Sequence, residues 1–459
     1  AEAAKATDIA ALYRRFGFHS PETFENWPAG LPSPPLDMPV GQNVGTASGT
    51  WPPIEVTISN IGCAACHSSV MYDETGAPDT TRVWLGAANG SINLEAWTGA
   101  LYAALRDRTG DAGLLMEVVE GLYPDTSLRE RLTLRHAILP ILRAEIAERE
   151  ATTGRLLPFR ASLAGATNGL DSLRNRLGLI PDDTLVEESI FNSVPDLGGR
   201  LWRTKLLNSG SYVIEGADPA AAIVAADITA AHREGLAGII AYFTVPSMGV
   251  TPEVAEAHIA DAARVADWMA TYRPPPFPGE IDLDRARAGQ MVYARACAEC
   301  HGEYNDSLTE PRLVRFPNWE GDVGTDPERA RLLTDEVAQA VNAGLFGRYI
   351  DARTVAGYAA PPLTGIWSSA PYLHNGSVPT LWHLMRPETR PARFEVGGHR
   401  LDLDKVGLDL DPPAGFVPWS MPAEVDTAAF GLSAAGHEVG FEGLSEAEKD
   451  DLLEYLKLL

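Results

Sequence analysis

Cysteine usage is the feature that most constrains this chain. Its 459 residues contain four cysteines, and these occur as two C-x-x-C pairs, Cys63 and Cys66 in "GCAACH" and Cys297 and Cys300 in "RACAECH". A histidine follows each pair at once, His67 and His301. C-x-x-C-H is the attachment pattern of c-type haem, in which the thiols form thioethers with the haem vinyl groups and the histidine binds the iron. The pattern predicts two covalently bound haem c groups, with His67 and His301 as iron ligands.

Zinc binding and thiol redox chemistry are the competing interpretations of the same cysteines. A structural zinc site separates its two C-x-x-C pairs by about 12–20 residues. Far more of the chain separates Cys66 from Cys297. A thioredoxin-like motif explains neither the second pair nor the two histidines. Both interpretations are therefore weaker than haem attachment.

Composition narrows the choice of partners and compartment. The formal net charge is −25, which argues against nucleic acid or an anionic membrane as partner. It favours a neutral substrate or a basic redox donor, such as a small cytochrome c or a cupredoxin. No apolar run approaches the roughly 18 residues of a membrane span. No basic start is followed by an apolar stretch, so no signal peptide is expected in these residues, and "AEAAKATD" resembles a mature N-terminus. Since haem c is attached outside the cytoplasm in bacteria, we expect a periplasmic or secreted protein.

Three stretches rich in proline and glycine divide the chain, at 27–41, 272–284 and 410–424. The second, "YRPPPFPGEIDLD", forces extended backbone and ends any helix, so it is the best domain boundary. We expect an N-terminal arm (1–50), an N-terminal haem domain with a helical insertion (51–275) and a C-terminal haem domain (280–459). No repeat is apparent beyond the two C-x-x-C-H motifs.

Helical signals dominate between these stretches. Residues 129–150 carry an apolar helical stripe that Pro140 is expected to kink, and 285–296 read as a helix that delivers Cys297. The last segment, "SEAEKDDLLEYLKLL", begins with a capping box of Ser445 and Glu448 and has an apolar leucine face. Small class I cytochrome c domains pair a first helix that delivers the haem with an amphipathic last helix. We therefore expect a mainly α protein with two class I cytochrome c-like domains, long loops and few short strands.

Several stretches resemble a known family. They are "MPVG", "NGLDSLRNRL" (168–177), "APPLTGIWSSAPYLHNGSVPTLWHL" (360–384), "RPARFEVGG" (390–398) and "AGHEVG". The chain resembles the bacterial dihaem cytochrome c peroxidase/MauG superfamily and is most similar to its RoxA-like (rubber oxygenase-like) branch. The resemblance implies an active N-terminal haem and an electron-transferring C-terminal haem. It also implies peroxide or dioxygen chemistry, and in some relatives a Ca²⁺ ion between the domains.

The sixth iron ligands decide which haem reacts, because an electron-transfer haem is six-coordinate and a catalytic haem keeps one face open. For the second haem the resemblance favours His437 in "AGHEVG" as the distal ligand, with Met385 as the alternative. For the first haem no ligand is evident nearby. Met248 is an alternative there, but a methionine is more often core filler. An open or weakly ligated first iron is therefore expected.

The segment 194–212 matches in position a family stretch near the active haem. It contains the candidate site residues Trp202, Arg203, Lys205 and Tyr212. A cation, Arg203 or Lys205, would stabilise the negative charge that develops on bound peroxide. Trp202, or alternatively Trp97, is a candidate for electron transfer between the haems. The plainer alternative is that Trp202 is core and the two cations are solvated. The "NSGS" sequence departs from the family pattern and weakens the case for rubber oxygenase chemistry.

The expected activity is peroxidase-like, with H2O2 or O2 activated at the first haem and an electron relayed by the second. An oxygenase acting on an apolar substrate and a non-enzymatic dihaem electron carrier are the alternatives.

Overall fold

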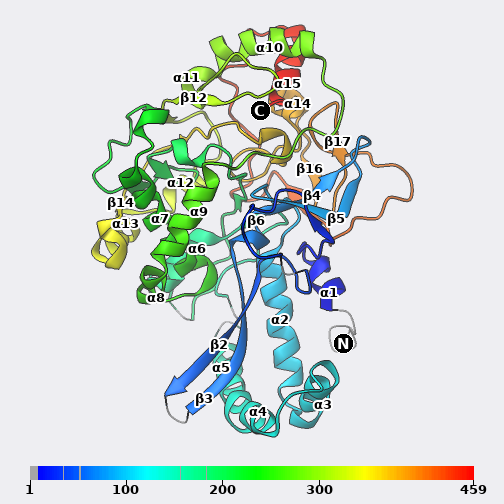
Figure 1. The fold of residues 1–459 in the computed structure, drawn as a ribbon, viewed down its shortest axis with the longest axis vertical. Helices are drawn as coiled ribbons and strands as arrows, with labels where there is room; N and C mark the ends of the chain where they lie inside the picture. Colours follow the sequence, from blue (N-terminus) through cyan, green and yellow to red (C-terminus); the bar gives the residue numbers. More distant parts are fainter. Residues whose placement is uncertain (1–8, 35, 51–52, 153, 156, 182) are drawn as a thin grey trace.

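The computed structural model describes residues 9–34, 36–50, 53–152, 154–155, 157–181 and 183–459. It is 38% helical and 15% strand. The helices are α1 (Ile9–Arg15), α2 (Leu94–Arg108), α3 (Ala112–Leu122), α4 (Leu128–Thr133), α5 (Leu139–Ala151), α6 (Gly169–Arg176), α7 (Ala230–Met248), α8 (Pro252–Ala257), α9 (Ile259–Met269), α10 (Leu283–Ala296), α11 (Ala298–His301), α12 (Glu328–Arg331), α13 (Asp335–Ala343), α14 (Leu381–Leu384) and α15 (Glu446–Leu456). Figure 1 shows long irregular segments filling the space between them.

The described strands are short, and they form small separate sheets. Three sheets have three strands: β1 (Thr23–Phe24), β5 (Pro78–Leu85) and β4 (Ser68–Tyr72); β10 (Ile223–Val224), β12 (Leu313–Phe316) and β11 (Glu303–Tyr304); β14 (Ile350–Ala352), β9 (Tyr212–Ile214) and β8 (Lys205–Leu206). The two-stranded pairs are β2 (Gln42–Thr50) with β3 (Pro53–Ile61), β6 (Ala166–Thr167) with β7 (Asn192–Ser193), β13 (Glu320–Gly321) with β15 (Tyr358–Ala359), β16 (Arg393–Val396) with β19 (Ala423–Asp426) and β17 (Leu401–Asp402) with β18 (Gly407–Leu408).

The segment expected to be an N-terminal arm is joined to the strands that follow it. β2 and β3 form one antiparallel hairpin across residue 50, and β1 pairs in parallel with β5. Residues on both sides of the expected boundary at 50 therefore share backbone hydrogen bonds.

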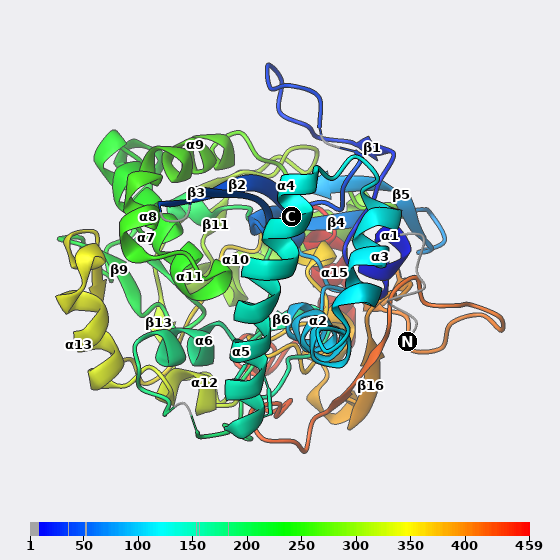
Figure 2. The same ribbon diagram turned by 90° about the horizontal axis from the view of Figure 1, so that it is seen from below.

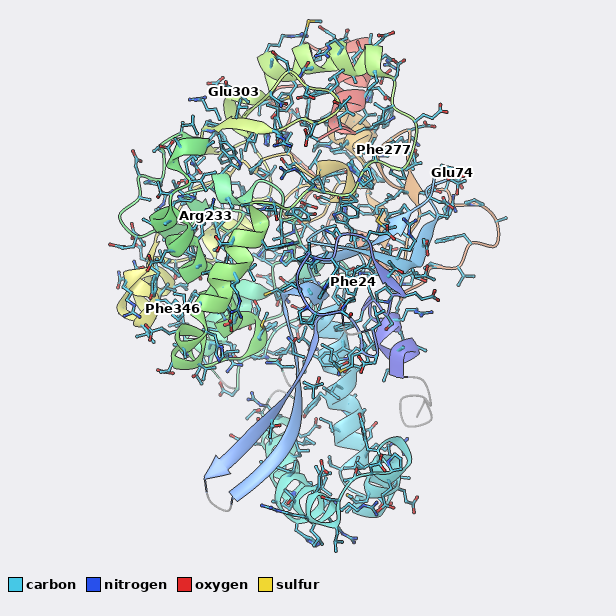
Figure 3. The ribbon with its side chains drawn as sticks, viewed as in Figure 1. Phe24, Glu74, Arg233, Phe277, Glu303 and Phe346 are labelled. Carbon is cyan, nitrogen blue, oxygen red and sulfur yellow. The ribbon has the colours of Figure 1, made fainter. Side chains whose placement is uncertain are left out.

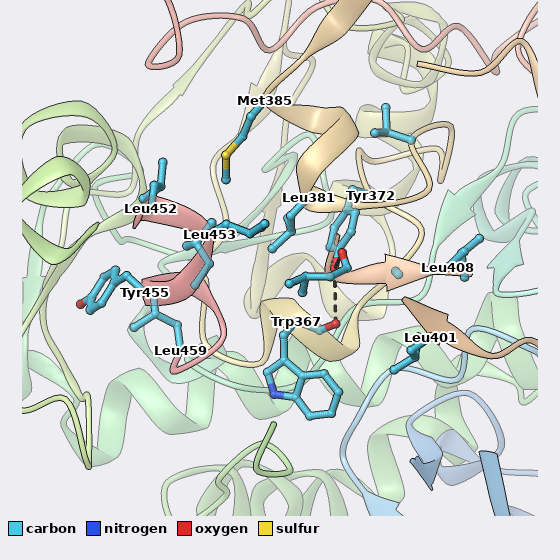
Figure 4. Packing of buried hydrophobic residues seen from close by; sticks show 14 of the residues in the cluster. Trp367, Tyr372, Leu381, Met385, Leu401, Leu408, Leu452, Leu453, Tyr455 and Leu459 are labelled. Carbon is cyan, nitrogen blue, oxygen red and sulfur yellow. Dashed lines mark hydrogen bonds between the residues drawn. The ribbon is translucent and has the colours of Figure 1, made fainter. Parts of the chain in front are cut away.

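Helices α10 and α15 cross closely in the C-terminal half. A Cβ atom at Gly289 would lie 1.9 Å from the backbone oxygen of Asp451, so only glycine fits this crossing. The predicted capping box is confirmed, since Ser445 accepts a hydrogen bond from the Glu448 N–H and Glu448 accepts from the Ser445 N–H. Figure 4 shows the leucines of α15 packed beside Trp367, Tyr372 and Met385 in one apolar cluster.

The linker before α10 is anchored in that cluster. Phe277, which is labelled in Figure 3, meets the Trp367 ring edge-on, with ring centroids 5.4 Å apart. The Trp367 indole N–H donates to the carbonyl of Pro275 at 3.0 Å. The predicted proline-rich boundary is thus a packed connection between the two haem-motif segments.

A second apolar cluster lies under α7, α9 and α13. Tyr242 of α7 is in ring contact there with Phe346, at 5.3 Å between centroids. Figure 3 labels Phe346. Tyr212 belongs to the same cluster and is 2% exposed.

Helices α2 to α5 project from the body as a lobe beside the β2–β3 hairpin (Figures 1 and 2). The helix predicted over 129–150 is irregular, because a π-helical turn, Leu134–Ile138, separates α4 from α5 just before Pro140. Of the predicted apolar stripe Leu139 is buried, whereas Leu132 is exposed. Among the described residues no helix has both the length and the apolar character needed to cross a membrane.

Candidate haem sites

The first C-x-x-C-H motif forms a tight turn. Cys63–Ala65 is a 3-10 turn, and the His67 N–H donates to the Cys63 carbonyl at 2.9 Å. The Nδ1 atom of His67 lies 3.0 Å from the carbonyl oxygen of Pro195. A carbonyl can only accept, so Nδ1 carries the proton and Nε2 keeps the lone pair that a metal needs.

The second motif has the same arrangement at the end of α10. Cys297 caps α10, and α11 carries His301. The Nδ1 atom of His301 lies 2.8 Å from the carbonyl oxygen of Pro361. Burial lowers the pKa of both His67 and His301 to about 4. Both imidazoles are therefore neutral at physiological pH, the form that binds iron.

None of the four cysteines is part of a disulfide. Burial raises the pKa of the Cys66 and Cys297 thiols to about 12. Each pair of thiols lies beside a histidine whose Nδ1 is oriented by a carbonyl, the arrangement expected for haem attachment.

The two proline carbonyls belong to a repeat that the sequence reasoning missed. Residues 194–212 and 360–378 align without a gap and share six identities, Pro195/Pro361, Leu197/Leu363, Gly199/Gly365, Leu207/Leu373, Gly210/Gly376 and Ser211/Ser377. The backbone repeats as well, because Leu207 and Leu373 both have positive φ, 68° and 65°. The expectation of no repeat beyond the cysteine motifs is wrong. A constant offset between the two P-x-L-x-G stretches was the signal that could have revealed it.

The two repeated loops, which we call loop A (194–212) and loop B (360–378), pack against each other. A Cβ atom at Gly199 would lie 2.7 Å from the ring of Pro362, and one at Gly365 would lie 2.5 Å from the carboxyl carbon of Asp196. Further along, the Asn208 amide donates to the His374 carbonyl at 3.3 Å. Each loop therefore holds one motif histidine and contacts the other loop.

A cavity lies beside His301, lined by residues of α10, α14, α15 and both loops. His437 also lines it, and the ring centroids of His301 and His437 are 5.9 Å apart. Two imidazoles on opposite sides of one metal, each with a metal–nitrogen bond of about 2 Å, need roughly 6 Å between ring centres. The Nδ1 atom of His437 is buried and has no partner among the described residues. These residues fit a haem with two histidine ligands.

Met385 lines the same cavity and is 1% exposed. It stands directly after α14 and packs with the leucines of α15 (Figure 4). The structure thus brings both predicted candidates to the second site, and His437 is the one whose ring faces His301.

The first site has different surroundings. Cys66 packs against a small apolar cluster with Phe16, Phe18 and Trp97. Over the part of the chain that the structure describes, no second imidazole is in ring contact with His67. Met248 ends α7, and its carbonyl accepts from the Asn60 amide at 3.3 Å, a short way before the first motif.

The residues predicted near the active haem lie in several environments. Arg203 is 2% exposed and lines the cavity of His301. Lys205 is buried and forms an ion pair with Glu320 at 2.8 Å, so neither cation is solvated. Tyr212 packs in ring contact with Tyr242 and Phe243. Trp202 is half-buried at the end of a 3-10 turn.

No cluster of three or more His, Cys, Asp or Glu side chains that could hold a metal ion occurs among the described residues. We therefore assign no residues to the Ca²⁺ ion that the family resemblance implies.

One segment of the chain matches a known protein family. Residues 357–395, which include Pro361 and Met385, match the family model described as RoxA-like, cytochrome c-like. The chain is 32% identical to the uncharacterized protein y4iM of Sinorhizobium fredii (strain NBRC 101917 / NGR234), over 42% of this chain and 52% of that protein. It is 31% identical to the uncharacterized protein y4iJ of the same organism, over 41% of each. The chain thus spans about half the length, or less, of these relatives. The RoxA-like cytochrome c segment implies c-type haem and makes this chain a haem-containing redox protein.

Proposed function

We propose that this chain is a dihaem c-type cytochrome oxidoreductase with a peroxidase-like reaction. Cys63, Cys66 and His67 would hold an N-terminal haem, which would supply the site for activation of H2O2 or O2. Cys297, Cys300 and His301 would hold a C-terminal haem, which would supply electron transfer to the first site. Membership of the dihaem peroxidase/MauG superfamily is part of the same proposal.

One observation carries the proposal, the difference between the two motif histidines. The ring of His437 lies 5.9 Å from that of His301, a spacing at which both imidazoles would bind one iron and would leave the second site no open coordination position. His67 has no such partner among the described residues. A six-coordinate haem suits electron transfer and an open haem suits binding of a small oxidant.

When bound, haem supplies an iron that can change oxidation state and bind peroxide or dioxygen at an open position. The chain positions this group through its own residues. The Pro195 and Pro361 carbonyls fix the rings of His67 and His301 and raise the basicity of their Nε2 atoms. Loop A contacts both sites, because Pro195 holds His67 and also lines the cavity of His301.

The family match favours a second candidate, an oxygenase that acts on an apolar substrate. It would use the same open first haem with dioxygen in place of peroxide. A pure electron carrier would instead have both irons six-coordinate. Export to the periplasm and a small basic donor protein, a cytochrome c or a cupredoxin, belong to the proposal because haem c is attached outside the cytoplasm and the chain is strongly acidic.

Spectroscopy of the purified holoprotein tests the proposal. We expect an electron paramagnetic resonance spectrum of the oxidised protein with one high-spin and one low-spin iron, and carbon monoxide binding by one reduced haem. Peroxide-dependent oxidation of a donor supports the peroxidase, and oxygen uptake with an apolar polymer supports the oxygenase. Two low-spin irons and no carbon monoxide binding would leave only the carrier.

A further inference from the structure

Two arginines of loop A reach the cavity of the second site, Arg203 fully buried and Arg200 half-buried. Arg203 is 2% exposed, and Arg200 and Arg203 both line the cavity of His301. Arg203 donates one Nη2 hydrogen bond to the Leu207 carbonyl at 3.2 Å. Its Nε atom is buried and has no acceptor among the described residues. Arg200 donates from Nε to the backbone carbonyl of Asp196 at 2.9 Å.

The charges at this end of the cavity do not balance. Asp196 lines the cavity as well, but its carboxylate already accepts from the Gly198 N–H at 2.6 Å and from the Tyr272 hydroxyl at 2.8 Å. Burial also raises the pKa of Asp196 to about 7, which weakens its negative charge. Two guanidiniums therefore face at most one carboxylate. A buried cation without a counter-charge costs several kcal/mol, so an anion is expected beside Arg203.

Most of the other side chains that line the cavity are apolar, among them Leu381, Leu384, Phe441, Leu452 and Leu456. A haem combines the same two kinds of surface, two carboxylates and an apolar ring system. A guanidinium binds a carboxylate through paired N–H groups, which matches the geometry that Arg203 leaves unused.

We propose that Arg203, with Arg200 beside it, binds a propionate carboxylate of the haem in the second cavity. Loop A, which orients the ligand of the first haem through Pro195, would then also supply the anion-binding end of the second haem's site. This inference rests on the proposed presence of a haem at Cys297 and Cys300.

Arg203→Gln in the holoprotein is the test, because glutamine keeps hydrogen-bonding capacity and removes the charge. The matched control is Arg329→Gln, since Arg329 is 1% exposed but does not line the cavity. We expect Arg203→Gln to shift the propionate bending modes of the low-spin haem in the resonance Raman spectrum and to lower the midpoint potential of that haem. Arg329→Gln should leave the propionate modes unchanged.

The pH dependence of the potential separates carboxylate binding from a merely nearby charge. Asp196 lines the same cavity and its pKa is raised to about 7 by burial, so the titration is made in an Asp196→Asn background. A propionate paired with Arg203 stays ionised, so the potential of the low-spin haem in Asp196→Asn should be flat between about pH 5 and 8. When Arg203→Gln is added, the carboxylate loses its partner, its pKa rises, and the potential should rise as pH falls through that range. If the double variant does not fold, the titration of Asp196→Asn still decides, because a sloping potential in that variant would overturn the inference.

The outcomes distinguish this inference from the function it rests on. A wild-type protein whose mass shows haem on only one motif contradicts the proposed dihaem function. Two bound haems with unchanged propionate modes and potential in Arg203→Gln contradict the carboxylate site alone. A carboxylate from a free organic acid would bind the same guanidinium, but its removal by dialysis would shift the potential of the wild type and leave the propionate modes in place, which also contradicts the inference.

Discussion

Replacing Gly365 by alanine tests the contact between the two repeated loops. Gly365 has φ +78°, and an added Cβ atom would lie 2.5 Å from Cγ and 2.7 Å from Oδ1 of Asp196. Asp196 cannot easily move, because Gly198 and Tyr272 hold both of its oxygens. Left-handed backbone costs a non-glycine residue about 1–2 kcal/mol, and overpacking a tight contact costs about 1–3 kcal/mol. The free energy of unfolding should fall by about 2–5 kcal/mol in total.

Gly178→Ala is the matched control. Gly178 has φ +71°, but an added Cβ atom there meets nothing within 4 Å. It therefore reports the cost of the backbone conformation alone, about 1–2 kcal/mol. Denaturant unfolding of both variants, with the slope m unchanged, gives the difference between their midpoints. Equal losses of stability in the two variants would refute the tight packing of Gly365 on Asp196.

Three further predictions follow from single side chains. His437→Ala should convert the low-spin iron of the oxidised protein to high spin, as read by electron paramagnetic resonance, and imidazole added to the solution should reverse the change; an unaltered low-spin signal would favour Met385 as the ligand. Because burial raises the folded-state pKa of Asp196 to about 7, above the unfolded value of about 3.9, the native protein binds an extra proton between these values and its stability should fall as pH rises through this window. Asp196→Asn should flatten that part of a stability–pH profile measured by denaturant unfolding, and an unchanged profile would contradict the assignment. Arg386→Met should lower the thermal unfolding temperature, since the buried guanidinium of Arg386 binds two carboxylates at the start of α15, at 2.6 and 2.7 Å, and the loss should be smaller at high salt.

Local patterns were read correctly from the sequence because their physics is local. The helix before Cys297 and the Ser445–Glu448 capping box depend on residues within one or two turns, and both are present. His437 was chosen by resemblance, and its position facing His301 depends on chain folding over more than a hundred residues. No periodicity or composition reports such a contact.

The environments of the loop A side chains were not predictable in the same way. Tyr212 and Lys205 read equally well as site residues or as structural residues, and tertiary contacts place one in an apolar cluster and the other against Glu320. The proline carbonyls behind His67 and His301 are backbone groups, which a search for reactive side chains overlooks. Only a comparison of the chain with itself reveals that Pro195 and Pro361 occupy the same place in two related loops.

The repeat also exposes an asymmetry that bears on electron flow. Arg200 and Arg203 of loop A align with Ile366 and Ser369 of loop B, so the cations lie on one loop only, and they line the cavity of His301. Two imidazole ligands give a haem a lower potential than an imidazole and a methionine do. Nearby positive charge acts in the opposite direction, because it stabilises the more negative ferrous state. With two histidine ligands the second haem would have no open position for an oxidant, but its potential would be low. The positive charges of the loop A arginines would raise that potential, so that this haem could still accept an electron.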